Sequence, residues 1–293
     1  MKCATVAIIG RPSAGKSTLL NCLTGYKVSI TAAVPQTTRN KIRGIVTEER
    51  GQLIFIDTPG WHDSQKKFNL RMKDLVSGAL AETDMALYVN DLSRPAGAEE
   101  EAIAEQLAAF PGPVIAALNK SDISPNQLEA NSAFIRQRLP RAELLSVSAL
   151  TGDGAAQLKT RLFALAPEGE ALYPPDYYTD QDPEFRASEI IREQAIAASR
   201  EELPHALYVE IADMEAKEQK DKPQLWIRAF IIVETESQKG IIVGAGGARI
   251  KSIRVGSQKE LGKIFPYRIQ LDLRVKARPR WRREDALLKK LIR

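Results

Sequence analysis

Short apolar runs alternate with longer mixed stretches along the first half of the chain. β-Branched and aliphatic residues dominate five runs of four to six residues, and the segments between them have the hydrophobic spacing of amphipathic helices. This alternation predicts an α/β domain with a mostly parallel sheet. The five predicted strands are residues 4–9, 53–56, 86–89, 114–118 and 144–147.

One further strand and a change in composition complete the predicted organisation. Residues 41–47 are followed by the turn-like Glu49-Arg50-Gly51, which predicts a hairpin with the strand at 53–56 and hence one antiparallel edge. After a helix that ends near Ala166, prolines and a glycine interrupt regular structure. We therefore expect a first domain over 1–166, a linker over 167–180 and a second domain over 181–293.

The second half of the chain has a different order of elements. A helix-like stretch over 186–199 is followed by strand-like 206–213 and 225–234, then apolar 241–243 and a glycine-rich loop over 244–247. Short helical runs begin at 248 and 257, and residues 267–276 alternate as a strand does. This order predicts an α+β type II KH domain, in which a Gly-x-x-Gly loop lies between two central helices.

Charge is unevenly distributed along the 293 residues, although the formal net charge is only +5. Residues 1–179 hold 19 basic and 19 acidic side chains, whereas residues 237–293 hold 16 basic and 4 acidic ones. A block this cationic favours a polyanionic partner, either nucleic acid or an anionic membrane surface. The alternative is a solvated basic face that binds nothing.

Composition also excludes several classes of protein. No apolar run approaches the roughly 18 residues of a spanning helix, and the first residues show no cationic leader, so we expect a cytoplasmic protein. The two cysteines and two histidines are too few for a disulfide framework, a cysteine-based zinc site or a histidine metal cluster.

The segment from Gly10 to Ser17 matches the phosphate-binding loop pattern, directly after an apolar strand and at the start of a helix. Its glycines let backbone N–H groups turn inward and form an anion-binding nest. We expect Lys16 to contact the β- and γ-phosphates of a nucleoside triphosphate and Ser17 to ligate Mg²⁺. The nucleotide-binding residues predicted here are Gly10, Ser13, Ala14, Gly15, Lys16, Ser17 and Thr18.

Two further motifs stand at predicted strand ends. The first, Asp57-Thr-Pro-Gly60, follows the phosphate loop by about forty residues, the spacing seen in nucleotide-binding domains of this kind. At this position Asp57 would hold Mg²⁺ through a water, and the Gly60 N–H would contact a γ-phosphate. Taken alone, this tetrapeptide is an ordinary turn.

Asn119-Lys120-Ser-Asp122 indicates which base is bound. A carboxylate at Asp122 accepts the ring N–H and the exocyclic amine of guanine, whereas adenine would leave it unpaired. The Ser148-Ala149 pair would supply a backbone N–H to the guanine carbonyl. An ATP-using kinase, the rival interpretation, has no use for this tetrad.

With these motifs the chain resembles the GTPases of the Era family over almost its whole length. The resemblance implies GTP hydrolysis to GDP with Mg²⁺, and it identifies residues 36–40 as the first switch, with Thr37 and Thr38 at the nucleotide. We favour Thr38 as the Mg²⁺ ligand; the alternative is that both threonines cap a turn. The catalytic groups implied are Lys16, Thr38 and Gly60.

Two residues depart from patterns seen in related GTPases. Trp61 stands where Ras-like enzymes carry a glutamine that orients water, so we expect slow intrinsic hydrolysis. Ser13 replaces the asparagine that helps hold an activating potassium ion in related GTPases. Potassium stimulation is therefore left open, because a serine hydroxyl or a main-chain carbonyl can still supply a ligand.

The resemblance also implies a partner, namely a single-stranded segment near the 3′ end of small-subunit ribosomal RNA, bound during assembly of the small ribosomal subunit. Glycines at the observed spacing let the backbone clamp a phosphate chain, and neighbouring cations pair with phosphates. A dinucleotide-binding glycine motif is excluded because Arg249 stands where a third glycine is needed. The predicted RNA-binding residues are Gly244, Ala245, Gly246, Gly247, Arg249, Lys251, Arg254, Arg274 and Lys276.

Two other functions remain as alternatives. A GTP-regulated adaptor at the cytoplasmic membrane surface would use the basic C-terminal segment but not the Gly-x-x-Gly loop. A tRNA-modification GTPase would share the switches, but the remaining chain offers no second catalytic motif. We expect a monomer that does not act on DNA, with peripheral membrane association as an open question.

Overall fold

The computed structural model describes residues 1–31, 40–58, 78–199, 206–218 and 223–291. The chain divides into two compact units, the first comprising most of residues 1–180 and the second most of residues 181–289. Within the described part of the chain, no helix is both long and apolar enough to span a bilayer.

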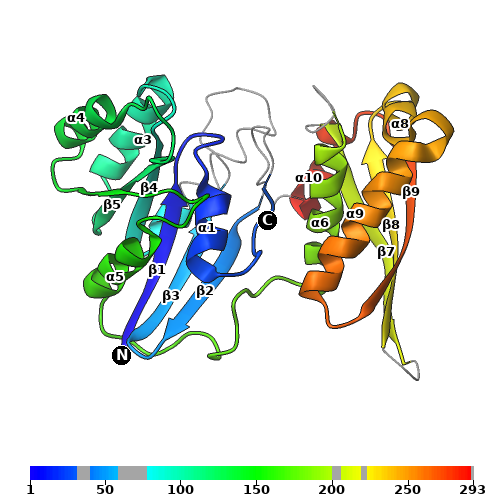
Figure 1. Cartoon of the computed structure of the whole chain (residues 1–293), viewed down its shortest axis with the longest axis horizontal. Coiled ribbons are helices and arrows are strands. Elements are labelled where there is room, and N and C mark those ends of the chain that lie inside the picture. Colours follow the sequence, from blue (N-terminus) through cyan, green and yellow to red (C-terminus); the bar gives the residue numbers. More distant parts are fainter. Residues whose placement is uncertain (32–39, 59–77, 200–205, 219–222, 292–293) are drawn as a thin grey trace. The chain divides into compact units, whose positions relative to one another are not determined.

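A six-stranded sheet forms the centre of the first unit, with strand order β2-β3-β1-β4-β5-β6 (Figure 1). Neighbouring strands are parallel except β2 and β3, which form the antiparallel hairpin expected from the sequence. The predicted α/β class is thus confirmed. The strands are β1 (Lys2–Ile9), β2 (Ile42–Glu48), β3 (Gly51–Asp57), β4 (Met85–Asp91), β5 (Val114–Asn119) and β6 (Glu143–Ser146).

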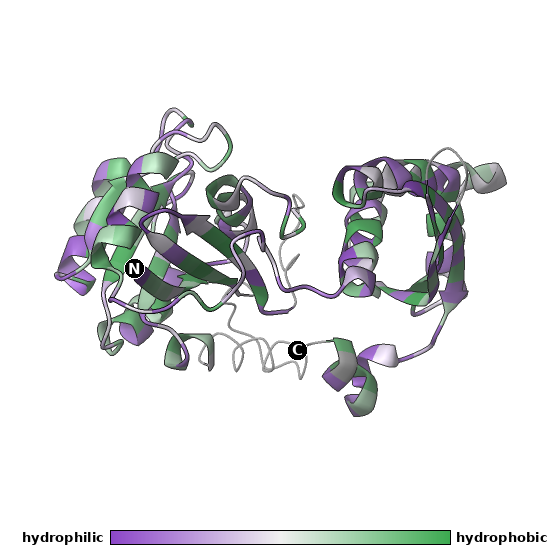
Figure 2. Ribbon diagram, turned by 90° about the horizontal axis from the view of Figure 1, so that it is seen from below, coloured by the Kyte–Doolittle hydropathy of each residue, from purple (hydrophilic) through white to green (hydrophobic). Residues whose placement is uncertain are grey.

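Helices cover both faces of this sheet, which explains why its central strands are apolar almost throughout. Helices α1 (Lys16–Thr24) and α5 (Ala155–Leu165) pack on each other over one face, and α3 (Ala98–Ala108) and α4 (Leu128–Arg138) pack on the other. Hydrophobic residues gather on the strands and on the inward helix surfaces (Figure 2). The sheet therefore presents its strand ends and the loops that follow them as the surfaces available for chemistry.

Residues 167–180, predicted as a linker, lie along the first unit, and we refer to them as the strap. The strap is hydrogen-bonded to β1 and β2: Cys3 N–H donates to the Pro167 carbonyl (3.0 Å), and Ile45 N–H donates to the Tyr178 carbonyl (2.9 Å). Tyr178 stacks on Tyr26 with ring centroids 4.2 Å apart. The strap therefore partly covers β2, the edge strand whose backbone would otherwise be free to pair.

The second unit has the predicted order of elements. A three-stranded sheet, β7-β8-β9, has one antiparallel and one parallel pairing, and helices pack on one of its faces. The KH-type arrangement is confirmed. The elements are α6 (Pro183–Ala197), β7 (Tyr208–Lys217), β8 (Gln224–Val233), α8 (Glu236–Val243), α9 (Ala248–Ile264), β9 (Arg268–Ala277) and α10 (Asp285–Leu291).

Two elements differ from the sequence prediction: helix α10 was not predicted, and α9 stands in place of two predicted helical runs. The helical runs expected from 248 and from 257 are a single helix, α9, which continues through Gly256. A Cβ atom at Gly256 would lie 2.5 Å from Oε1 of Gln194 on α6. Glycine at this position therefore leaves room for the Gln194 side chain between α6 and α9, and it does not end the helix.

Candidate nucleotide and RNA sites

The phosphate loop connects the end of β1 to the start of α1, so that backbone N–H groups gather at a helix N-terminus. Gly15 has φ 92°, and a Cβ atom there would lie 2.3 Å from Asn119 Nδ2. Only glycine fits this position, because both the left-handed backbone and the contact exclude a side chain. Ser13 also adopts a left-handed conformation, with φ 62°.

Lys16 is buried inside this loop. Its Nζ donates hydrogen bonds to the carbonyl oxygens of Gly10 (3.0 Å) and Arg11 (2.9 Å). Burial lowers the pKa of Lys16 to about 8, and the nearby Asp57 carboxylate opposes this shift only in part. Burying the ammonium therefore costs solvation free energy. An anion bound by the backbone N–H groups of the phosphate loop would offset this cost.

Ser17 and Asp57 meet at the mouth of the loop, as the magnesium prediction requires. Ser17 Oγ donates to Asp57 Oδ2 (2.7 Å), and Ser29 Oγ donates to the same oxygen (2.9 Å). A carboxylate with adjacent hydroxyls is the hard oxygen donor set that suits Mg²⁺. Ser29 belongs to no motif, and the sequence prediction missed it. No cluster of three histidine, cysteine or acidic residues suited to a metal occurs in the described ranges.

The base-recognition motif is held by side-chain and backbone groups from three loops. Asn119 Nδ2 donates to the Ala14 carbonyl (2.8 Å), and Asn119 Oδ1 accepts from the Ala149 N–H (2.9 Å). Ser148 Oγ donates to Asp122 Oδ1 (2.6 Å), which orients that carboxylate. The Ala149 N–H, predicted to bind the guanine carbonyl, thus has a protein partner, and its contact with guanine stays a prediction.

Part of the predicted site lies outside the described residues. This applies to Thr37, Thr38, Gly60 and Trp61. Thr18 is described and lies in the first turn of α1, directly after Ser17 in the sequence. The assignments of these residues to nucleotide therefore stay predictions.

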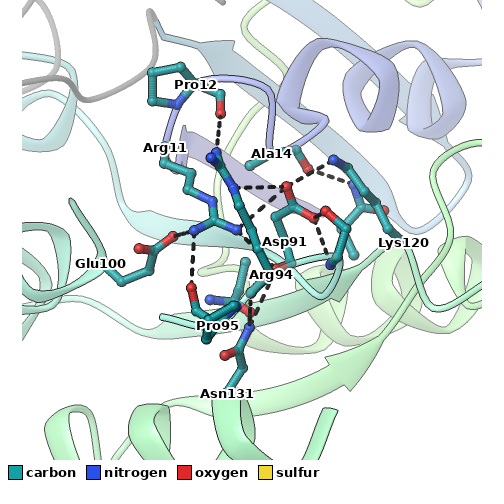
Figure 3. Close-up of polar contacts among 12 residues, drawn as sticks. Arg11, Pro12, Ala14, Asp91, Arg94, Pro95, Glu100, Lys120 and Asn131 are labelled. Atoms are coloured by element: carbon teal, nitrogen blue, oxygen red, sulfur yellow. Dashed lines mark hydrogen bonds and ion pairs between the residues drawn. The ribbon is translucent and has the colours of Figure 1, made fainter. Parts of the chain in front are cut away.

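A buried ionic network that the sequence motifs did not reveal joins the phosphate loop to the base-recognition loop (Figure 3). Asp91 Oδ2 accepts from Lys120 Nζ (2.8 Å) and lies 3.5 Å from Arg11 Nη2. Arg11 Nη1 pairs with Glu100 (2.7 Å), and both side chains are almost fully buried. The position of Asp91 at the carboxyl end of a central strand is the one sequence feature that could have indicated it.

In the second unit, the loop Gly244–Gly247 separates α8 from α9, as predicted. Gly246 and Gly247 have φ 57° and 77°, and a Cβ atom at either would meet nothing closer than 4.0 Å. The loop backbone is thus open to an approaching phosphate chain. Arg249 donates to the Ile241 carbonyl across the loop, and Lys251 and Arg254 are exposed on the next turns of α9.

The structure does not bring Arg274 and Lys276 to that loop. They alternate along β9 with Leu271 and Leu273, which are buried on the helix-covered face, so the two cations project from the opposite face. Lys276 Nζ lies 3.3 Å from the ring centroid of Phe230, also on the opposite face. Contacts of these cations with RNA stay a prediction, and they require RNA to reach a second surface of this unit.

The fold and these two sites define a phosphate-loop GTPase joined to a KH domain. A family model described as 50S ribosome-binding GTPase matches residues 5–120, and one described as KH domain matches residues 202–282. The chain is 49% identical to GTPase Era of Treponema denticola over 294 residues, covering 99% of both proteins. It is 44% identical to GTPase Era of Borreliella burgdorferi over 293 residues, covering all of both. The chain belongs to the Era family of GTPases.

Solved structures agree over the whole chain. A crystal structure of Era in complex with MgGDPNP and nucleotides 1506–1542 of 16S ribosomal RNA superposes with a TM-score of 0.91. That protein is 33% identical, and the match covers 99% of this chain and 98% of the other. An Aquifex aeolicus Era variant bound to GDP·AlF4⁻ has the same identity, coverage and TM-score. GTP hydrolysis is thus the activity of this family, and guanine nucleotide with Mg²⁺ is bound by its members.

Proposed function

We propose that this protein is a GTP-dependent switch that binds the 3′ region of small-subunit ribosomal RNA and assists assembly of the small ribosomal subunit. The observation that carries this proposal is the full-length match to an Era protein bound to both MgGDPNP and 16S ribosomal RNA. The glycine loop between α8 and α9 supports it from the chain's own geometry.

Nucleotide binding uses the residues around the phosphate loop. Lys16 and the N-terminal N–H groups of α1 bind the phosphates, and Ser17 and Asp57 hold Mg²⁺, which neutralises charge on the phosphates when bound. Asp122, held by Ser148, selects guanine. Trp61 offers an indole N–H donor but no side-chain oxygen that could accept a hydrogen bond from the attacking water, so intrinsic hydrolysis is slow and serves as a timer.

Nucleotide state is communicated through the β2–β3 hairpin. Thr38 and Gly60 contact the γ-phosphate side of GTP; one precedes β2 by a few residues and the other follows β3. The two strands meet at this end, where Ile42 pairs with Asp57. Loss of the γ-phosphate therefore removes contacts next to both strands at the same end of the hairpin.

The strap provides the connection from this hairpin toward the second unit. It is bound to β2 through the Ile45 N–H and through Thr179 Oγ1, which donates to the Arg43 carbonyl (2.8 Å). Arg43 also pairs with Asp180 (2.9 Å), and α6 begins only a few residues later, with Asp182 as its N-cap. A shift of β2 is thus passed to the segment from which α6 of the KH unit starts.

RNA binding is assigned to the open backbone of residues 244–247 and to Arg249, Lys251 and Arg254. Ala245 and Gly246 offer no cation within the loop, so the flanking basic residues on α9 supply the charge. The protein acts as a cytoplasmic monomer, and association with the inner face of the membrane is a secondary property of its basic C-terminal segment. Potassium stimulates hydrolysis only if Ser13 or a main-chain carbonyl replaces the missing asparagine.

Crosslinking to RNA in living cells, followed by sequencing of the bound fragments, tests the proposal. Fragments from the 3′ end of 16S ribosomal RNA are expected, and they should be depleted in a Gly247→Asp variant expressed at the same level. Because one matching family model is named for the 50S subunit, enrichment of 23S fragments is the sharpest contrary result. Recovery of tRNA, or of no RNA, would also reject the proposal.

A further inference from the structure

Asp91 lies between the two loops that recognise the nucleotide. It is the last residue of β4, it is 1% exposed, and it is in register with Asn119 on β5. On the other side of β4 lies β1, which leads into the phosphate loop. A carboxylate in this position contacts cations from both loops, Arg11 on one side and Lys120 on the other (Figure 3).

The Asp91 carboxylate is held in one orientation. Its Oδ1 accepts from the backbone N–H of Ser93 (2.9 Å) and from Ser93 Oγ (2.6 Å). Its Oδ2 faces three cations, of which Lys120 is the nearest at 2.8 Å, followed by Arg11 at 3.5 Å and Arg94 at 3.8 Å. Burial raises the pKa of Asp91, but hydrogen bonds from Lys120 and Ser93 outweigh it, so the pKa lies below the ordinary value. The residue is therefore an anion at neutral pH.

The two carboxylates of this network, Asp91 and Glu100, differ in the cation that lies closest to each. Arg11 has Glu100 as its close partner at 2.7 Å, whereas its distance to Asp91 is 3.5 Å. Of the described residues, Asp91 is the one carboxylate paired with Lys120. Lys120 also has a left-handed backbone, with φ 67°, and it carries its ammonium on a flexible four-carbon stem.

We propose that Asp91 is a positioning residue for guanine-nucleotide binding, acting through Lys120. Asp91 holds the Lys120 ammonium at the end of β4 and thereby keeps the lysine stem beside the base-recognition motif. It also prevents the ammonium from moving to the phosphates, which we expect Lys16 to bind. This inference rests on the proposed function, since it concerns the same nucleotide site.

A double-mutant cycle on GDP affinity tests it, with Asp91→Asn, Lys120→Met and the double variant. Asp91→Asn removes the charge but keeps the side-chain shape, and it should weaken GDP and GTP binding alike, by on the order of tenfold. On the Lys120→Met background the same change should have less than a twofold effect. The hydrolysis rate of protein preloaded with GTP, measured in a single turnover, should stay within about twofold of the unchanged chain.

A structural role for Asp91 predicts a different pattern. If the tenfold loss persists on the Lys120→Met background, or if no loss is seen, the inference is overturned. If Lys120→Met itself leaves GDP affinity unchanged, the base-site assignment in the proposed function fails as well, which separates the two failures. Glu101→Gln on α3, which removes an exposed ion pair with Arg138, is the matched control.

Ser93→Ala keeps the test available if Asp91→Asn does not fold. Ser93 is exposed, and the change removes only the 2.6 Å hydrogen bond to Asp91 Oδ1. A loss of GDP affinity of about threefold, which disappears on the Lys120→Met background, would support the inference. An equal loss on both backgrounds would contradict it.

Discussion

Gln52 and Tyr173 are joined by a pair of hydrogen bonds that imitates the pairing of two strands. Gln52 Nε2 donates to the Tyr173 carbonyl (2.9 Å), and Gln52 Oε1 accepts from the Tyr173 N–H (3.0 Å). The same oxygen accepts from the Leu172 N–H (2.9 Å). Gln52 is fully buried on β3, so one side chain of the hairpin supplies three of the hydrogen bonds that hold the strap.

Replacing Gln52 with leucine should therefore loosen the strap. The change keeps the apolar volume but leaves two backbone N–H groups and a carbonyl without this partner, at a cost of about 2–3 kcal/mol. We expect the thermal midpoint to fall by roughly 5–10 °C. The ratio of RNA affinities in the GTP-loaded and GDP-loaded states should move toward one.

Two measurements check this prediction, a melting curve and RNA titrations in both nucleotide states. Gln137→Leu, on the exposed side of α4, is the matched control and should change neither. An unchanged affinity ratio together with a lowered melting point would show that the strap stabilises the protein but does not transmit nucleotide state.

Ser148 Oγ donates a 2.6 Å hydrogen bond to Asp122 Oδ1 and so orients the carboxylate that we expect to recognise guanine. Asp122→Asn replaces an acceptor with an amide donor, which suits the carbonyl that xanthine carries in place of the guanine amine. The preference should shift from GTP toward xanthosine triphosphate, by competition binding. Ser148→Ala should weaken GTP binding without changing the base preference, because the Asp122 carboxylate remains but loses the hydrogen bond that orients it. Undiminished guanine selectivity in Asp122→Asn would mean that the base pocket is misplaced.

Local sequence patterns were sufficient for the elements whose geometry depends on neighbouring residues. The phosphate loop, the β2–β3 hairpin and the glycine loop were predicted because each depends on glycines and strand ends within a few residues. Asp91 with Lys120, and Gln52 with Tyr173, were not predicted, because the partners are 29 and 121 residues apart and belong to no shared motif. Pairing of β4 with β5 brings Asp91 and Lys120 together, and the hydrogen bonding of the strap to the first unit brings Tyr173 to Gln52.

The second unit shows a similar limit. In the sequence, Gly256 appeared to separate two helical runs. In the structure it lies inside one helix, and the space that a side chain would need there is occupied by Gln194 of α6. Arg274 and Lys276 were grouped with the glycine loop because they are basic and nearby in the chain. The alternation of β9, anchored by buried Leu271 and Leu273, places them on the other face. Charge counts along a sequence do not show which face of a sheet carries the charge.

RNA binding should be sensitive to side chains at Gly247. Aspartate there would have to adopt φ 77°, and it would place an anion where a phosphate is expected to approach. We expect affinity for a single-stranded 16S 3′ oligonucleotide to fall by more than tenfold. Gly262→Asp is the control, since Gly262 lies in open space on α9, the helix that Gly247 precedes, and the change adds the same charge. Equal losses for the two variants would indicate a general charge effect and not a backbone clamp.

The buried ammonium of Lys16 predicts a specific dependence on pH. Its pKa in the folded protein is about 8, against 10.5 for an ordinary lysine. Between these values the unfolded chain binds more protons than the folded one, so the stability of the nucleotide-free protein should rise with pH from about 8 to 10.5. Affinity for GDP should fall over the same range, because binding then requires uptake of a proton. Lys16→Met should abolish tight binding and remove both trends.

Denaturant titrations of the free protein and calorimetry with GDP in buffers of different ionisation enthalpy measure these two effects. Proton uptake on binding should be near zero at pH 7 and should increase above pH 8. A GDP affinity that is flat between pH 7.5 and 9.5 would contradict the placement of Lys16 at the phosphates.

Potassium dependence can be tested at Ser13. This residue has φ 62°, a left-handed conformation that asparagine accepts more readily than most residues do. Ser13→Asn should therefore fold normally and supply the amide oxygen that related GTPases use for potassium. We expect hydrolysis by the variant to be stimulated severalfold more by K⁺ than by Na⁺ at equal ionic strength, and hydrolysis by the unchanged chain to respond less. Equal K⁺ stimulation of both proteins would show that main-chain carbonyls, or the serine hydroxyl itself, are sufficient ligands.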